Sequence, residues 1–167
     1  GSRDRVLDGD EIRRILPLLT YPAPPSLCVR LPPKQDYRPI ALRFILLTAP
    51  RRGGVEEMKW KDVGLDCRLW GEPEGKGPCA KVPRQPVIHL SDAALSLLRS
   101  LPPERRKNSE NHVFPNSNGG KLDNSPRITS AIQTASVTSA WQRHEIRRPP
   151  RTHHTPLSTV LTVTPRN

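Results

Sequence analysis

Long apolar runs are absent from this sequence of 167 residues. A membrane-spanning helix needs roughly 18 or more consecutive apolar residues, and no run approaches that length. A basic amphipathic helix, which would lie on a membrane surface, does not stand out either. We therefore expect a soluble protein.

Cysteine is also scarce. The three cysteines, Cys28, Cys67 and Cys79, are odd in number and have no CxxC spacing. Nothing at the N-terminus resembles a signal peptide. These features fit a protein of the reducing cytoplasm.

Acidic residues are outnumbered by basic ones. The chain has 27 Lys and Arg against 16 Asp and Glu, a formal net charge of +11 and a pI of about 10.4. Such a charge attracts polyanions. Nucleic acid is therefore the first candidate partner, and a membrane surface is the second.

Neither a metal site nor a base-stacking surface stands out. His153 and His154 are adjacent, but no Cys, Asp or Glu lies near them in the sequence, so we expect two exposed histidines. Trp60, Trp70 and Trp141 are expected to anchor the core or a sheet face rather than to stack on bases.

Apolar residues at helical spacing predict five short helices, and the length of the chain favours one domain. Asp8 or Asp10 can cap the first helix, and Ser91 can cap the fourth. The second segment, IALRFILLT, fits a strand or a helix by length, but Ala41 and its apolar neighbours favour a buried helix, which Pro50 ends. The predicted helices cover residues 8–19, 40–48, 55–65, 91–101 and 126–141.

Short β-compatible segments bounded by Gly and Pro occur between the third and fourth predicted helices. Residues 67–70, 79–82 and 86–90 are three such segments, and we predict that they form a small antiparallel sheet. The predicted fold class is α+β and mainly α-helical, with helices packed around this three-stranded sheet.

Two motifs around the predicted sheet contain clustered cations. The segment LLTAPRRGGVEEMKWKDVGLD, at residues 46–66, has Arg51 and Arg52 ahead of a tryptophan and an aspartate. Further on, Lys81 precedes PVIHLSDAALSLL, with Lys76 as the competing lysine of the same hairpin.

Two further motifs follow in the second half of the chain. HVFPNSNGG occupies residues 112–120, and RHEIRR contains His144, Arg147 and Arg148. In this order the four motifs resemble the catalytic domain of tyrosine recombinases, the phage integrase family, whose fold is of the DNA breaking-rejoining type. The resemblance runs over roughly residues 3–152, and the joint order makes it more specific than any one motif.

The resemblance implies a DNA strand exchange reaction. In this family a tyrosine oxygen attacks a DNA phosphodiester, displaces a 5′ hydroxyl and forms a 3′ phosphotyrosyl link, without a metal or nucleotide cofactor. Arg51 and Arg147 would grip the phosphate through bidentate donors. Lys81 would protonate the leaving oxygen, and His144 would assist the tyrosine. The further DNA-contacting residues are Arg52, Arg84 and Arg148.

The same resemblance implies partners and a location. The partners would be double-stranded DNA with an attachment-type site and other recombinase protomers on that DNA, with no membrane. The location would be the bacterial cytoplasm, at the nucleoid. Gly1-Ser2 is typical of a cloning scar, residues 3–152 are the expected domain, and residues 153–167 are expected to form an irregular or aberrant C-terminal tail.

The sequence lacks the tyrosine that the family places after its second arginine motif. Tyr21 and Tyr37 both precede Arg51, and we interpret Tyr37 as a packing residue at a helix start. Gly54 stands where the family has a glutamate, and Pro149 where it has a threonine. We predict a catalytically impaired domain for site-specific DNA recombination or integration, from a frame-shifted or truncated gene. The alternative is a non-catalytic DNA-binding remnant of a prophage integrase.

Overall fold

Helices and a small antiparallel sheet make up the part of the protein that the structure describes. This computed structural model describes residues 7–27, 30–49, 54–71, 79, 87–122, 126–138 and 141. The helices are α1 (Gly9–Ile15), α2 (Arg38–Thr48), α3 (Gly54–Glu57), α4 (Asp92–Ser100) and α5 (Pro126–Ser136). The strands are β1 (Val63–Gly64), β2 (Leu69–Gly71) and β3 (Val87–His89). Short 3-10 helices occur at residues 16–18, 25–27, 33–35, 60–62 and 103–107.

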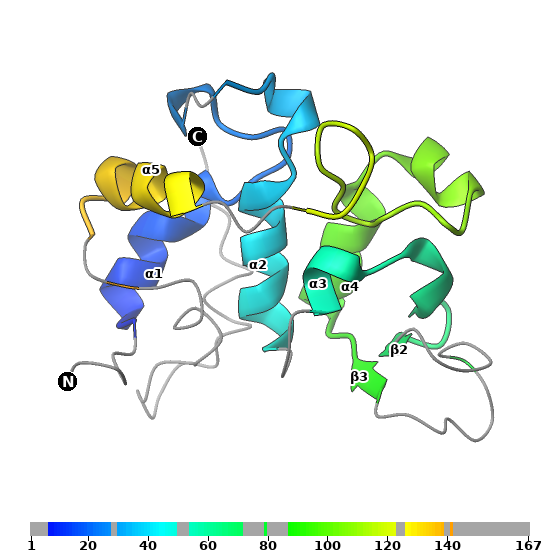
Figure 1. Cartoon of the computed structure of the whole chain (residues 1–167). Coiled ribbons are helices and arrows are strands. Elements are labelled where there is room, and N and C mark those ends of the chain that lie inside the picture. The colour runs from blue at the N-terminus through cyan, green and yellow to red at the C-terminus, as the bar shows by residue number, and fades with distance from the viewer. Residues whose placement is uncertain are drawn as a thin grey trace.

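Helix α2 runs through the middle of the molecule (Figure 1). On one side α1 and α5 pack against each other, and on the other side α4 packs against α2. The sheet lies beyond α3 and α4 (Figure 1). Helix α2 is apolar around most of its circumference because it is enclosed by these elements, with seven buried residues among its eleven. The predicted α+β, mainly helical fold class is confirmed.

The starts of two predicted helices are confirmed by their caps. The Asp8 side chain accepts a hydrogen bond from the backbone N–H of Glu11 at 2.8 Å, so Asp8 rather than Asp10 is the N-cap of α1. Ser91 accepts a hydrogen bond from the Ala94 N–H at 3.2 Å and caps α4. Both contacts satisfy backbone donors that the first helical turn leaves without a partner.

The sheet has three antiparallel strands in the order β1-β2-β3, but the sequence placed one of them wrongly. β2 and β3 fall within two of the predicted segments, with Leu69 paired to His89. The third strand is Val63–Gly64, which the sequence assigned to a helix over residues 55–65. Of the predicted strand at residues 79–82, the structure describes Cys79, which lies in a turn.

Long-range hydrogen bonds explain the short α3 and the strand that follows it. The backbone N–H groups of Trp60 and Lys61 donate to the carbonyl oxygens of Asn111 and Ser109, at 3.0 and 2.9 Å. These contacts cross about fifty residues of chain, so no local periodicity reveals them. The two-residue strand β1 is likewise too short for an alternating pattern.

Two of the three cysteines are joined. Cys67, in the turn before β2, forms a disulfide with Cys79, twelve residues later in the chain. The fit to a reducing compartment rested on the odd number of cysteines and the absence of CxxC spacing, and this disulfide does not support it. A pair at this separation depends on how the intervening chain folds back, which spacing alone does not show.

The tryptophans lie in the core, as predicted. Trp60, Trp70 and Trp141 expose 7%, 4% and 0% of their surface. Helix α5 starts at Pro126 as expected but ends at Ser136, because Val137 takes a left-handed conformation with φ 56° that cannot continue the helix. None of the helices in the described ranges combines the length and the apolar character needed to cross a membrane.

Candidate functional site

All of the residues predicted to contact DNA lie outside the described residues. They are Arg51, Arg52, Lys81, Arg84, His144, Arg147 and Arg148, together with the competing Lys76. The structure does describe the elements on both sides of residues 50–53 and 72–86, and Trp141 ahead of His144. These flanking elements are what the structure shows of the predicted site.

The segment with Arg51 and Arg52 joins the ends of two helices. Helix α2 ends at Thr48, whose hydroxyl donates to the Phe44 carbonyl at 2.8 Å. Ala49 follows in a left-handed conformation, with its N–H donating to Ile45 at 2.8 Å, and this turns the chain out of the helix. Helix α3 begins at Gly54. Both ends of residues 50–53 are thus held by regular structure.

The segment with Lys76, Lys81 and Arg84 connects two neighbouring strands. Gly71, the last residue of β2, pairs with Val87, the first residue of β3. Residues 72–86 therefore connect two paired antiparallel strands. Lys76 and Lys81 lie outside the described residues, and within this connection the structure describes Cys79, which is bonded to Cys67.

The bases of these two segments are in contact through Trp70. A Cβ built on Gly54 would lie 3.3 Å from Trp70 Cζ2, and the Phe44 ring centroid lies 5.5 Å from that of Trp70. The start of α3 thus lies against β2, one residue before the connection begins. The absence of a side chain at residue 54 has a local reason, because a glutamate there would require Trp70 to move.

The segment with His144 and Arg147 follows an anchored tryptophan. Trp141 is fully buried, its indole N–H donates to Thr138 Oγ1 at 2.8 Å, and its carbonyl accepts from the Gln133 side chain at 2.6 Å. Trp141, Phe44 and Trp70 belong to the same hydrophobic core. The three predicted segments therefore adjoin one core.

The two tyrosines lie at the opposite end of α2 from Arg51. Tyr37 directly precedes α2, its ring stacks on that of Tyr21 at 4.4 Å, and its hydroxyl donates to the Tyr21 oxygen at 3.2 Å. Burial raises the pKa of Tyr37, which opposes formation of a phenolate. The length of α2 separates this pair from residue 49 by about 16 Å. The interpretation of Tyr37 as a packing residue is confirmed.

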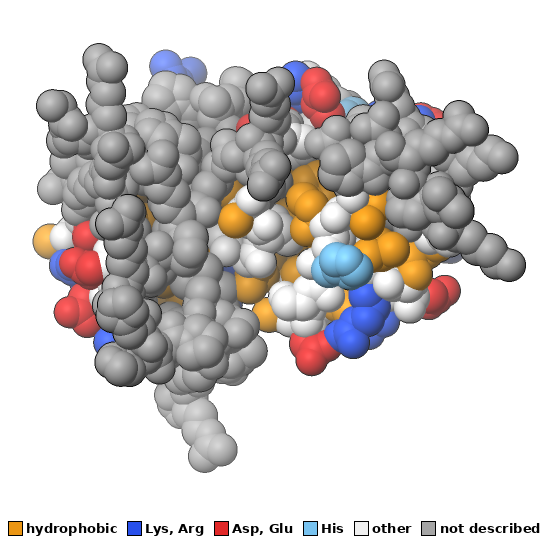
Figure 2. All heavy atoms as spheres, turned by 90° about the horizontal axis from the view of Figure 1, so that it is seen from below, with side chains coloured by type: hydrophobic (Ala, Val, Ile, Leu, Met, Phe, Trp, Pro, Cys, Tyr) orange, Lys and Arg blue, Asp and Glu red, His pale blue; other side chains and the backbone are white. Residues whose placement is uncertain are grey.

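Charges of both signs lie on the face seen from below in Figure 1. Among the described residues of that face, acidic and basic side chains are neighbours rather than forming a single basic patch (Figure 2). Elsewhere in the described part of the chain, cations are also matched by acids, as in the ion pair of Arg68 with Asp92. The described residues contain no group of three or more His, Cys, Asp or Glu that could hold a metal.

The sequence analysis missed a group of arginines at the amino end of α2. Arg30, Arg38 and Arg127 line one pocket there, although Arg38 and Arg127 are 89 positions apart in the sequence. Each is isolated in the sequence, so no motif marks them. The loop, α2 and α5 bring them together.

Comparisons with known proteins bear on the fold. The sequence matches no protein-family model, and no curated protein matches it. The crystal structure of XerA recombinase is similar, with a TM-score of 0.57 and 18% sequence identity over 86% of this chain and 46% of that chain. The fold is recombinase-like.

The likeness to XerA recombinase has a defined extent. This chain spans less than half the length of the XerA recombinase chain. At this level of identity the similarity concerns the path of the backbone, and a shared fold alone does not carry an activity across. The function must be argued from the residues.

Proposed function

We propose that this chain is a tyrosine-recombinase-like domain that binds double-stranded DNA and grips a phosphodiester group, with catalysis impaired by the lack of a tyrosine nucleophile. The observation that supports the proposal is that Phe44, Trp70 and Trp141, which lie beside the predicted segments in the sequence, share one core within a recombinase-like fold. The motifs alone would be weak evidence, since arginine pairs are usually solvated surface charge.

The grip depends on two arginines from distant segments. Arg51 follows the carboxyl end of α2, and Arg147 follows the anchored Trp141. Guanidinium groups suit a phosphodiester because each offers planar, paired donors and keeps its charge. Donors held in place before reaction would stabilise the additional negative charge of a pentacoordinate transition state.

Lys81 and His144 would act on protons at the same phosphate. An ammonium on the β2–β3 connection would protonate a leaving 5′ oxygen. Lys76 is the alternative, and it differs from Lys81 in lying inside the loop that the Cys67–Cys79 disulfide closes.

A specific observation favours the non-catalytic alternative, a DNA-binding remnant of a prophage integrase. Both tyrosine hydroxyls are engaged at the amino end of α2, where Tyr21 donates to the Lys34 carbonyl at 2.8 Å and accepts from Tyr37. Neither hydroxyl lies at the carboxyl end of α2, which Arg51 follows in the sequence. DNA binding without strand cleavage is the expected behaviour.

The salt dependence of DNA binding tests the grip. We expect Arg51→Ala with Arg147→Ala to reduce the slope of log K against log salt by about 2, because each phosphate contact contributes about 0.9. The matched control is Arg13→Ala with Arg99→Ala, which removes the same charge from exposed positions on α1 and α4. Fluorescence anisotropy with a labelled duplex measures both slopes.

A phosphate grip and binding by net charge alone predict different salt slopes in this experiment. A slope that changes in the first double variant and not in the control supports a phosphate grip. Equal changes in both would mean that net charge alone drives binding, and the grip would be abandoned. A covalent adduct with a nicked suicide duplex, visible on a denaturing gel, would contradict the proposed impairment.

A further inference from the structure

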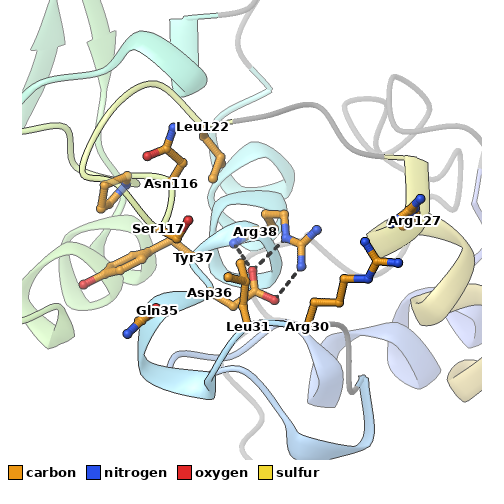
Figure 3. Close-up of a pocket in the computed structure, with 11 residues that line it drawn as sticks. Arg30, Leu31, Gln35, Asp36, Tyr37, Arg38, Asn116, Ser117, Leu122 and Arg127 are labelled. Carbon is orange, nitrogen blue, oxygen red and sulfur yellow. Dashed lines mark hydrogen bonds and ion pairs between the residues drawn. The ribbon is translucent and has the colours of Figure 1, made fainter.

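A pocket of about 290 Å³ lies at the amino end of α2, and its lining includes none of the residues predicted to contact DNA. Figure 3 shows its walls, which come from the loop before α2, the turn at residues 115–117, and the start of α5. The lining residues are Arg30, Leu31, Gln35, Asp36, Tyr37, Arg38, Pro115, Asn116, Ser117, Leu122 and Arg127.

The lining carries more positive than negative charge. It contains three arginines and one acid, so its formal charge is +2. Asp36 is buried and accepts two hydrogen bonds from Arg38, from Nε at 2.8 Å and from Nη2 at 2.9 Å. Arg38 therefore neutralises Asp36, the one acidic residue in the lining, through a bidentate ion pair. An incoming anion would therefore meet the guanidinium group of Arg30, which is exposed.

Two parts of the wall are held in place before any ligand binds. The Asp36–Arg38 pair fixes the first turn of α2 (Figure 3). Asn116 orders the opposite wall, since its side-chain oxygen accepts from the N–H groups of Asn118 and Gly120 at 2.9 and 2.8 Å. A pocket with rigid walls loses little conformational freedom when it binds.

Other donors in the pocket have capacity for a ligand. In the described part of the chain, Arg30 is exposed and makes no hydrogen bond or ion pair, and the side chains of Gln35 and Ser117 make none either. Arg30 also has a left-handed backbone, with φ 48°, an unusual conformation for a residue with a side chain. Figure 3 shows Arg30 and Arg127 extending to the same side of the pocket.

The remaining wall of the pocket is apolar and indicates which chemical group the ligand carries beside its anionic group. Leu31, Tyr37, Pro115 and Leu122 line it. The volume is at the lower limit for small-molecule sites, which are typically about 300 to 1,000 Å³. A phosphate with one attached sugar or ring fits this combination of guanidinium groups, polar donors and apolar wall.

We propose that this pocket binds a phosphate ester, with Arg30 as the principal cation that contacts it. The phosphate can belong to a free mononucleotide or to a DNA strand, since both present the same group. The lining shares no residue with the predicted phosphodiester grip, so variants of the pocket test it independently of that grip.

Titration of the full chain with deoxyadenosine monophosphate, followed by calorimetry, tests the proposal. We expect Arg30→Gln to weaken binding about tenfold or more, because charged hydrogen bonds to phosphate are among the stronger polar contacts. Arg13→Gln removes an equal charge from an exposed position on α1 and is expected to leave the affinity unchanged. Circular dichroism of both variants checks that the fold is intact.

A parallel titration with duplex DNA distinguishes the two sources. Loss of mononucleotide affinity with unchanged duplex affinity assigns the pocket to a free ligand, and loss of duplex affinity assigns it to a DNA phosphate. Ser117→Ala should weaken whichever ligand binds, by a smaller factor. If neither ligand distinguishes Arg30→Gln from Arg13→Gln, the proposal is overturned.

Discussion

The two ends of α2 differ in how their functions can be recognised. At the carboxyl end, sequence motifs predict a DNA phosphate site, and the structure describes the helices, strands and tryptophan that support it. At the amino end no motif exists, yet the structure holds a pocket with paired charges and ordered walls. Contiguous motifs reveal residues that act within one segment, whereas a pocket built from three distant segments becomes visible only in the fold.

Loss of the Phe44 ring, which packs α2 against the sheet residue Trp70, should cause the largest loss in the free energy of unfolding. Phe44 is fully buried and its ring lies 5.5 Å from Trp70 and 5.4 Å from Phe114, centroid to centroid. We expect Phe44→Ala to lower the free energy of unfolding by about 3 to 5 kcal/mol, because it leaves a cavity. Urea unfolding measures the change.

Arg99→Ala is the control for this substitution. Arg99 is exposed on α4, and a change there should stay within about 0.5 kcal/mol. A loss below about 1 kcal/mol for Phe44→Ala would show that α2 and the sheet are not packed as described.

Loss of the Cys67–Cys79 disulfide should have the next largest effect on the free energy of unfolding. It sharpens the comparison of the two ends of α2 because the bond constrains the β2–β3 connection and not the pocket at the amino end. A disulfide that closes a loop of this length raises the free energy of unfolding of the protein by about 3 kcal/mol. We expect Cys67→Ser to lower the free energy of unfolding by about that amount, and a reductant to lower the stability of the unmodified chain similarly. Urea unfolding with and without reductant gives both values.

Reductant should then leave the free energy of unfolding of Cys67→Ser unchanged. Cys28→Ser is the matched control for replacing a cysteine by serine. If reductant destabilises Cys67→Ser as much as the unmodified chain, the effect has another origin. Equal stability of the oxidised and reduced chain would show that the connection between β2 and β3 does not depend on the pair.

The smallest of these effects belongs to the amino end. Tyr21→Phe removes the hydroxyl that donates to Lys34 and accepts from Tyr37, while it keeps the stacked ring. We expect a loss of about 1 kcal/mol, the usual value of a hydrogen bond in a partly exposed position. DNA binding should stay unchanged, and anisotropy would reveal a loss that contradicts the exclusion of this tyrosine from the site.

Local rules predicted much of the fold. The caps at Asp8 and Ser91, the buried α2 and the apolar side of α4 follow from spacing and side-chain chemistry within ten or so residues. The strand Val63–Gly64 and the Cys67–Cys79 bond depend on partners that local patterns do not contain. The predicted grip residues belong to motifs that occur in a characteristic order along the sequence, while Arg30 and Arg127 belong to no motif.

The contact between Gly54 and Trp70 sets a condition on any side chain introduced at residue 54. A Cβ there would lie 3.3 Å from the Trp70 ring, so that ring would have to shift by a few tenths of an ångström. Substitutions at residues 54 and 70 are therefore expected to have coupled rather than additive effects on the free energy of unfolding. A change at residue 54 is best made together with a smaller side chain at residue 70.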